Sequence, residues 1–282
     1  MNKVMVIGGS DSGGGAGIQA DLKTVTALGA FGTTVITAIT VQNTLGVQSV
    51  HAVPPDVVGD QLDSIMNDIG TDAVKTGMLL NEAIVAVVSE KIREYGIDNV
   101  VVDPVLHAKD GSALLEGNAA VKKLISELLP LALIVTPNIP EAEILCGISI
   151  KQPAHLEEAA RVIHGLGAKN VFVKGGHAPE DWPSSKKGVI EDLFYDGKDF
   201  RRFVSPKVDT GDAGSVHGSG CTLASAIATG LALGKDIEEA ALSAKEFLND
   251  VIRRSIKVGR GYNVLDPSGS VGKHGRERKN QS

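Results

Sequence analysis

Residues 3–40, KVMVIGGSDSGGGAGIQADLKTVTALGAFGTTVITAIT, contain two short apolar runs on either side of an amphipathic segment. The apolar runs, Val4–Gly8 and Thr33–Thr40, are rich in β-branched residues, and each predicts a β-strand. Between them, apolar side chains recur at the spacing of one helix face along Ala16–Leu28. A strand, a helix and a second strand in this order predict a parallel βαβ unit.

The alternation of strands and helices continues over most of the 282 residues. Further strands are predicted at Ala73–Thr76, Val100–Val102, Ala132–Val135 and Asn170–Val173. Further helices are predicted at Pro54–Ile69, Asn81–Tyr95, Asn118–Leu129, Pro140–Leu145, Ala154–Leu166, Gly218–Leu233 and Ile237–Lys257. Val189–Tyr195 and Phe200–Val204 flank Asp196-Gly197 and predict a β-hairpin. We therefore expect an α/β fold in which helices cover both faces of a mostly parallel sheet.

No linker or change of composition marks a domain boundary before the last residues of the chain. Residues 1–266 are therefore predicted to form a single domain. The remaining stretch, PSGSVGKHGRERKNQS at residues 267–282, is polar and has no hydrophobic period. It predicts a disordered tail.

The composition excludes several classes of protein. Hydrophobic residues make up 43% of the chain, and 28 basic residues against 34 acidic ones give a net charge of −6, which argues against a nucleic-acid partner. The longest apolar stretch, Leu128–Val135, is far shorter than the roughly 18 residues of a membrane span. Two cysteines, Cys146 and Cys221, are too few for a disulfide scaffold. No signal peptide is expected, and we predict a cytoplasmic protein without a membrane partner.

The glycine-rich segment between the first strand and helix is a candidate ligand site. Gly8–Asp21, GGSDSGGGAGIQAD, lacks the Gly-Lys-Ser/Thr ending of a phosphate-binding loop. Its match to a dinucleotide fingerprint is weak, because Thr33–Thr40 does not end in the acid that would hold a ribose. A tight turn is one interpretation. Three consecutive glycines exceed what one turn needs, so we favour a small ligand packed against bare backbone.

A second candidate site is His217–Thr222, HGSGCT, directly before an apolar helix. Small residues at a helix start leave backbone N–H groups uncovered, and the helix dipole adds positive potential, so this turn predicts an anion site. The same field is expected to lower the pKa of the Cys221 thiol. A buried core cysteine is the alternative. Its position favours a role for Cys221 in activating a hydroxyl beside a transferring phosphoryl group.

Polar residues follow the ends of several predicted strands. Asp103, Asn138, Glu141 and Lys174 each lie at or just after such an end. The carboxyl ends of parallel strands meet at one edge of a sheet, where ligands bind. Carboxylate and amide oxygens suit Mg²⁺, and a lysine suits phosphate groups, although each residue alone could serve as a helix cap.

The combination of motifs closely resembles the hydroxymethylpyrimidine/phosphomethylpyrimidine kinases of thiamine biosynthesis, within the ribokinase-like superfamily. The matching segments are SDSGGGAGIQADLKT (Ser10–Thr24), TAITVQNTLGVQSV (Thr37–Val50), KTGML (Lys75–Leu79), VVDPVLHAKDG (Val101–Gly111), TPNIPEAEIL (Thr136–Leu145), VKGGH (Val173–His177) and HGSGCTLASAIA (His217–Ala228).

The resemblance implies a three-layer αβα sandwich and an ATP-dependent kinase that uses Mg²⁺. The implied substrates are 4-amino-5-hydroxymethyl-2-methylpyrimidine and its monophosphate, and a homodimer is implied as the assembly. The residues that the resemblance implies for substrate binding are Gln42, Asp21, Gly9, Val41, Met78 and Val105, and those for ATP binding are Asn138, Lys174, Asp209 and Thr210. Metal binding is implied for Asp103 and Glu141, and an anion hole for Gly218, Ser219 and Gly220. Catalytic roles are implied for Lys174 and for Cys221 as the base, and a flap over the site for Ala108–Gly111.

Two segments depart from the family pattern. The loop Asp209–Val216 is longer than the usual connection, and Gly259–Asn263 replaces a Gly-His-Gly-rich ending. The nearest alternative is a pyridoxal/pyridoxine kinase of the same superfamily. Cysteine-dependent kinases of that kind carry a second cysteine in the flap, which Val105–Gly111 lacks, so we favour the pyrimidine. A non-catalytic binding protein on the same fold is a further alternative, which the complete anion hole, base and metal set argue against.

Overall fold

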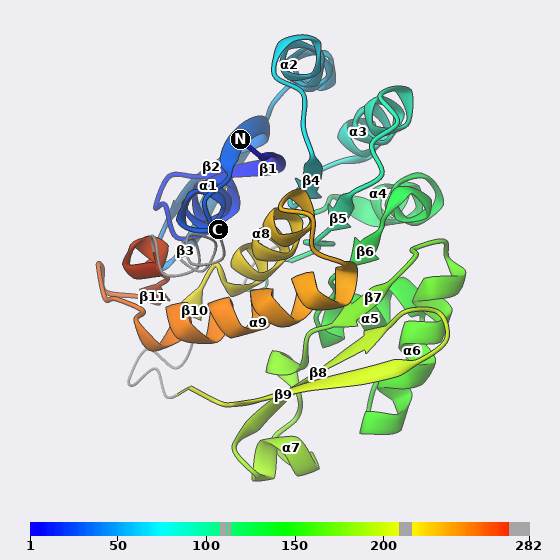
Figure 1. Ribbon diagram of the computed structural model, residues 1–282, viewed down its shortest axis with the longest axis vertical. Helices are drawn as coiled ribbons and strands as arrows, with labels where there is room; N and C mark the ends of the chain where they lie inside the picture. Colours follow the sequence, from blue (N-terminus) through cyan, green and yellow to red (C-terminus); the bar gives the residue numbers. More distant parts are fainter. Residues whose placement is uncertain (108–110, 112–113, 209–215, 271–282) are drawn as a thin grey trace, which may run out of the picture.

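The computed structural model describes residues 1–107, 111, 114–208 and 216–270. Within them, a nine-stranded sheet has the order β3-β2-β1-β4-β5-β6-β7-β8-β9 (Figure 1). The strands are β1 (Lys3–Asp11), β2 (Phe31–Asn43), β3 (Gly46–Ala52), β4 (Ala73–Thr76), β5 (Val100–Val102), β6 (Ile134–Val135), β7 (Val171–Val173), β8 (Val189–Tyr195) and β9 (Phe200–Pro206). Pairing is parallel from β2 through β7, whereas β3, β8 and β9 pair antiparallel. The predicted mostly parallel α/β sheet is confirmed.

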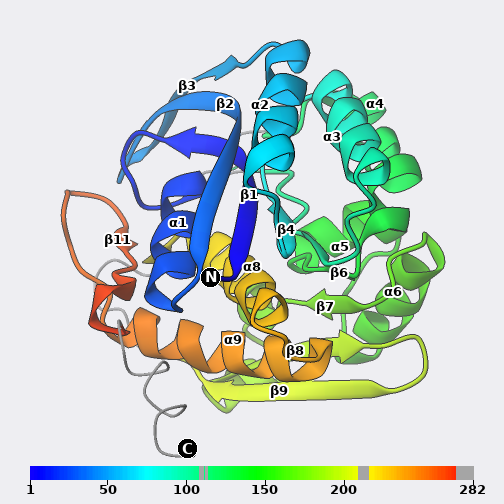
Figure 2. The same cartoon turned by 45° about the horizontal axis from the view of Figure 1, so that its top comes forward.

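Helices cover both faces of the sheet, as Figure 2 shows. They are α1 (Gly17–Ala27), α2 (Pro55–Asp68), α3 (Glu82–Glu94), α4 (Gly117–Lys123), α5 (Ile139–Cys146), α6 (Pro153–Gly165), α7 (Pro183–Lys186), α8 (Ser219–Ala232) and α9 (Ile237–Arg253). Each face has its own hydrophobic core: α1, α8 and α9 pack on one, and α2 to α6 pack on the other. Strand β1 supplies both cores, because Val4 and Val6 face one of them and Met5 and Ile7 face the other. The three-layer αβα sandwich is confirmed.

Several element bounds differ from the sequence-based expectation. Strand β3 was not predicted, because its side chains are half-buried or exposed and give no clean alternation. The helix expected over Asn118–Leu129 is α-helical only to Lys123, and a π-helical turn at Leu124–Leu128 and a 3₁₀ turn at Leu129–Leu131 follow. Pro130 explains this ending, because it offers no N–H to continue an α-helix. Helix α9 stops at Arg253, four residues before the predicted end.

The chain after α9 returns to the edge of the site. Strand β11 (Asn263–Val264) pairs in parallel with β10 (Val216–His217), and the Tyr262 N–H donates to the carbonyl of Thr44 at 2.9 Å. Pro267–Ser270, the first residues of the predicted tail, form a 3₁₀ turn. The other residues of that predicted tail lie outside the described part of the chain. Among the described residues, no helix is long and apolar enough to cross a membrane.

Candidate active site

A cavity of about 460 Å³ opens at the carboxyl ends of the parallel strands, where the polar clusters of the sequence meet. It is lined by most of the predicted site residues, namely Gly9, Asp21, Gln42, Met78, Asp103, Val105, Asn138, Glu141, Lys174, Gly218, Ser219, Gly220 and Cys221. The expectation that these segments converge is therefore confirmed, whereas their individual roles stay predictions.

Among the described residues, Val41 is the predicted site residue that does not line this cavity, and it is 47% exposed. Its role as an apolar wall stays a prediction. Asp209 and Thr210 lie outside the described residues, and so does the predicted flap apart from Gly111, which lines the cavity.

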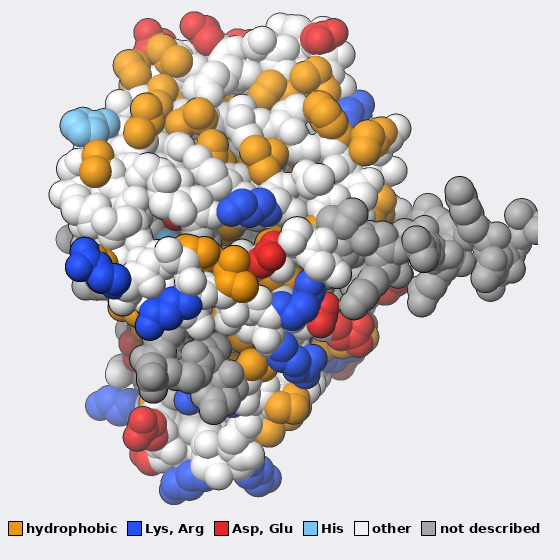
Figure 3. All heavy atoms as spheres, turned by 90° about the vertical axis from the view of Figure 1, so that its left-hand side faces the viewer, with side chains coloured by type: hydrophobic (Ala, Val, Ile, Leu, Met, Phe, Trp, Pro, Cys, Tyr) orange, Lys and Arg blue, Asp and Glu red, His pale blue; other side chains and the backbone are white. Residues whose placement is uncertain are grey.

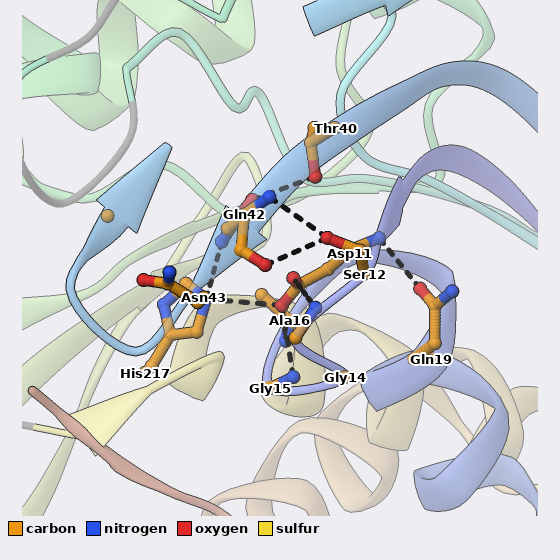
Figure 4. A network of polar contacts seen from close by, with 12 residues as sticks. Asp11, Ser12, Gly14, Gly15, Ala16, Gln19, Thr40, Gln42, Asn43 and His217 are labelled. Atoms are coloured by element: carbon orange, nitrogen blue, oxygen red, sulfur yellow. Dashed lines mark hydrogen bonds and ion pairs between the residues drawn. The ribbon is translucent and has the colours of Figure 1, made fainter. Parts of the chain in front are cut away.

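Asp11 organises the glycine-rich turn. Its carboxylate accepts backbone N–H groups from Gly13 at 2.8 Å, Gly15 at 3.0 Å and Ala16 at 2.8 Å (Figure 4). These bonds fix the turn without any ligand. The role of Asp11 was missed in the sequence, although a carboxylate two residues before three glycines was a usable signal.

The glycine-rich turn and the start of α8 touch each other through bare backbone. Gly218 has a φ of +86°, and a Cβ there would lie 2.0 Å from the Gly15 carbonyl oxygen. Gly17 has a φ of +57°, and a Cβ there would lie 2.3 Å from the Gly9 carbonyl oxygen. A side chain at Gly218 would separate the two turns, and a side chain at Gly17 would distort the glycine-rich turn itself. Part of the glycine requirement therefore comes from the protein's own packing, beyond the predicted ligand contact.

A buried ion pair lies beneath the cavity. The Nζ atom of Lys75 is 2.9 and 2.8 Å from the two carboxylate oxygens of Asp21, and Ser225 donates to the same carboxylate at 2.7 Å. Both charged side chains are 1% exposed or less. Burial opposes the charge of Lys75, but the carboxylate of Asp21 and the neighbouring Cys221 and Asp103 outweigh it and raise the pKa of Lys75. Lys75 was missed as a site residue, since a lysine on a short strand ordinarily faces solvent.

Elsewhere in the cavity, the ammonium group of Lys174 lies close to the carboxylates of Asp103 and Glu141. The Nζ atom of Lys174 lies 2.7 Å from Asp103 Oδ1 and 3.7 Å from Glu141 Oε2. Glu141 also accepts the Asn138 N–H at 2.7 Å, in a capping box that starts α5. Burial, together with the charge of Asp103, raises the pKa of Glu141 to about 7 despite the nearby Lys174. A Cβ at Gly220 would be 3.3 Å from Lys174 Nζ, so the α8 turn faces this cluster directly.

The donor set fits a magnesium ion held in part by phosphates. No group of three or more His, Cys, Asp or Glu side chains suited to a metal occurs in the described residues. Asp103 and Glu141 provide two carboxylates beside the turn predicted to bind phosphate. Mg²⁺ commonly takes one or two carboxylates and completes its octahedron with water and substrate phosphates.

Cys221 lies in the first turn of α8, but the expected lowering of its pKa is wrong. Burial, with the negative charges of Asp21 and Asp103, raises the pKa of the Cys221 thiol to about 11, although Lys75 and a hydrogen bond from Gly17 act in the opposite direction. Burial of the thiol is therefore the largest influence on its pKa.

A second buried ion pair supports the far wall. Lys245 Nζ lies 2.6 Å from Asp192 Oδ2, and Asp192 accepts the Gly175 N–H at 2.7 Å. Asp192 and Lys245 line the cavity but gave no recognisable sequence motif. The hydrogen bond from Gly175 to Asp192 fixes the residue that follows Lys174.

Comparisons with known proteins agree with this geometry. The family model described as Phosphomethylpyrimidine kinase matches residues 11–266. The chain is 49% identical over 263 residues to the thiamine biosynthesis bifunctional protein ThiED of Geobacter sulfurreducens, covering 93% of this chain and 51% of that protein. It is 42% identical over 262 residues to the hydroxymethylpyrimidine/phosphomethylpyrimidine kinase of Bacillus subtilis, covering 92% of both.

Solved structures that resemble this chain include a pyridoxal kinase and a phosphomethylpyrimidine kinase. An ADP complex of Bacillus subtilis pyridoxal kinase matches with a TM-score of 0.84 and 35% identity, covering 95% of this chain and 98% of that one. The phosphomethylpyrimidine kinase of Clostridium difficile matches with a TM-score of 0.76 and 39% identity, covering 89% of this chain and 100% of that one.

Replacing the buried lysine tests the ion pair beneath the cavity. Lys75→Met should lower the free energy of unfolding by about 3–5 kcal/mol, because it leaves the Asp21 carboxylate buried without its counter-charge. Urea denaturation measures the loss. The control is Lys123→Met, which breaks a 2.9 Å pair with Glu127 at a 28% exposed lysine and should cost much less, because water screens an exposed ion pair. Equal losses of unfolding free energy for Lys75→Met and Lys123→Met would contradict the assignment of Lys75 and Asp21 as a stabilising buried ion pair.

The pH dependence of thiol modification tests the raised pKa of Cys221. In a Cys146→Ser background, Cys221 is the single remaining thiol. Because the thiolate is the reactive form and the pKa is about 11, the rate of alkylation by iodoacetamide should rise about tenfold per pH unit from pH 7 to 10. A rate that levels off near pH 8 would show an ordinary or lowered pKa instead.

Proposed function

The chain belongs to the phosphomethylpyrimidine kinase family, and we propose that it transfers a phosphoryl group from ATP to 4-amino-5-hydroxymethyl-2-methylpyrimidine and then to the resulting monophosphate. The observation that carries this proposal is the 42% identity to a kinase of that name over 92% of both chains. The chain spans 51% of the bifunctional ThiED protein, so the proposal covers the kinase activity alone.

The cavity offers separate ends for the pyrimidine and the phosphates. Gln42 carries both a hydrogen-bond donor and an acceptor, which suits the amino group and ring nitrogen of the pyrimidine. Met78 and Val105 line the same cavity and suit the faces of an apolar ring. The anion-binding turn Gly218–Cys221 and Lys174 suit the transferring phosphoryl group. Bound Mg²⁺ would neutralise phosphate charge beside Asp103 and Glu141.

Cys221 is suited by position to accept the proton of the hydroxymethyl group. A thiol whose pKa is about 11 is protonated at neutral pH, so this role requires that the thiolate be stabilised when substrates bind. Lys75 is the nearby positive charge that lowers the pKa of this thiol. The second phosphorylation depends less on a base, because the attacking phosphate oxygen already carries negative charge.

Pyridoxal kinase activity is the second candidate. It is supported by the 35% identity and TM-score of 0.84 to the pyridoxal kinase of Bacillus subtilis, whose structure contains ADP. The absence of a second cysteine from Val105–Gly111 favours the pyrimidine. That ADP complex also supports ATP as the phosphoryl donor for this chain.

The assembly and location are further parts of the proposal. A homodimer is supported by the sheet edge at β3, beside which the large side chains Ile39, Val41 and Leu45 are about half exposed. Figure 3 shows the side of the molecule that carries this edge, with hydrophobic side chains spread over its upper half. A cytoplasmic location is supported by the proposed use of ATP and by two cysteines that are both free.

A coupled ADP-release assay tests the substrate. With ATP and Mg²⁺, hydroxymethylpyrimidine should be phosphorylated with a higher kcat/KM than pyridoxal, because Gln42 matches the aminopyrimidine edge. A higher value for pyridoxal would favour the second candidate. No ADP release above background with either compound would favour a non-catalytic binding protein.

Two single variants separate a base from an electrostatic role. Cys221→Ala should reduce turnover of the alcohol about 10²- to 10⁴-fold, as loss of a general base does, and reduce turnover of the monophosphate much less. Lys174→Ala should reduce both, because each reaction needs charge neutralisation. Cys146→Ala is the matched cysteine control and should leave both rates near wild type. Equal losses on both substrates for Cys221→Ala would mean that Cys221 acts by shaping the anion hole.

A further inference from the structure

A chain of polar groups connects the two turns at the pyrimidine end of the cavity (Figure 4). The amide nitrogen of Gln42 lies 2.7 Å from His217 Nε2, and His217 Nε2 lies 3.3 Å from Asp11 Oδ2. On the other side of the amide, the hydroxyl of Thr40 lies 3.1 Å from the Gln42 oxygen and 3.0 Å from the Ser10 carbonyl oxygen. The proposed mechanism uses Gln42 but assigns no task to His217.

In this orientation of the Gln42 amide, the hydrogen-bond donors and acceptors of the network do not match. If the amide nitrogen of Gln42 donates to His217 Nε2, that ring nitrogen carries no proton. Its lone pair then also lies close to the carboxylate of Asp11, and two acceptors face each other without a hydrogen between them. The single hydroxyl hydrogen of Thr40 must then serve two acceptors, the carbonyl oxygen of Ser10 and the amide oxygen of Gln42. Burial opposes the charge of Asp11, but bonds from His217, Ala16 and Gly13 outweigh it and lower the pKa of that carboxyl, so Asp11 is an acceptor only.

A half-turn of the Gln42 amide frees the Thr40 hydroxyl to donate to Ser10 alone. It also lets one His217 Nε2–H face two acceptors, the Gln42 oxygen and Asp11, in place of a lone pair that faces a carboxylate. The amide oxygen then accepts from a protonated His217 Nε2, which Asp11 also favours. The amide nitrogen donates to the Thr40 oxygen, and the Thr40 hydroxyl donates to Ser10 without competition. Oxygen and nitrogen of an amide occupy nearly the same space, so the network alone decides between the two orientations.

His217 itself is held firmly in place. It lies on β10, opposite Val264 of β11. A Cβ at Gly15 would come within 2.7 Å of the His217 ring and 2.9 Å of Val264. The glycine turn therefore packs directly against the ring, which leaves the Gln42 amide as the group that adjusts.

We propose that His217 is a positioning residue that turns the Gln42 carbonyl toward itself, and so fixes the order in which the site presents an acceptor and a donor to the ring of its substrate. This inference rests on the proposed function. His217 directly precedes the α8 turn, so a pyrimidine whose hydroxymethyl group lies at that turn would present its neighbouring amino group to the Gln42 carbonyl on the His217 side and its unprotonated ring nitrogen to the N–H on the Thr40 side. A ring with an oxo group and a protonated ring nitrogen presents the reverse order and leaves both groups unpaired.

Steady-state kinetics with two matched variants test the proposal. His217→Gln keeps an N–H donor near the position of Nε2, whereas His217→Met has similar length and no strong hydrogen-bonding group. The substrates are hydroxymethylpyrimidine and its analogue with a 4-oxo group in place of the 4-amino group. KM for ATP reports whether the phosphate end of the site is intact in each variant.

We expect His217→Met to raise KM for the amino compound about 10- to 100-fold, with a smaller effect on kcat and on KM for ATP. The preference for the amino over the oxo compound should fall by a similar factor, and His217→Gln should restore most of it. An unchanged preference in His217→Met, or equal losses in the two variants, would overturn the proposal while the proposed function stands. Failure of the wild-type protein to phosphorylate the amino compound would overturn the proposed function and this inference with it.

Discussion

The close contact between two glycine turns is the constraint on which the site depends. Gly218 of one turn lies against the carbonyl of Gly15 in the other, at a distance that leaves no room for a side chain at Gly218. One turn follows β1 and the other starts α8, so the contact joins segments about two hundred residues apart in the chain. It brings the turn predicted to bind the phosphoryl group next to the residues predicted to face the substrate. A kinase needs this proximity, because the hydroxyl and the phosphoryl group must meet at near-contact distance.

Charge is arranged around this contact in two buried clusters. Asp21 with Lys75 lies beneath the cavity, and Lys174 bridges Asp103 and Glu141 at the phosphate end. Each of these lysines pairs with carboxylates of the protein itself, so the protein's own groups hold both clusters in place. Burial, with the charges of Asp21 and Asp103, raises the pKa of the Cys221 thiol to about 11. The proposed role of this cysteine as a base therefore depends on the charge that the substrates bring into the cavity.

Much of the fold follows from local pattern, whereas much of the site's chemistry does not. Strands Ala73–Thr76 and Val100–Val102 were predicted to the residue, because short β-branched runs between amphipathic helices have few other interpretations. The motif residues were found because glycines and acids at strand ends are visible in the sequence. Lys75 was not, since its partner Asp21 is 54 residues away in the chain, whereas the local partners of Asp11 were a signal that was overlooked. The pKa of Cys221 was misjudged because the helix dipole is a local property and desolvation is a tertiary one. Val41 lies outside the cavity lining, because membership of a motif does not decide which face of a strand a side chain occupies.

The most direct test of this account is a crystal structure of the chain with the aminopyrimidine alcohol and a non-hydrolysable ATP analogue. The account predicts that the amino group lies at the Gln42 amide and that the hydroxymethyl oxygen lies about 3–3.5 Å from the terminal phosphorus, beside the Cys221 thiol and the α8 turn. A pyrimidine bound away from Gln42, or one whose hydroxymethyl group points away from the Gly218–Cys221 turn, would contradict it.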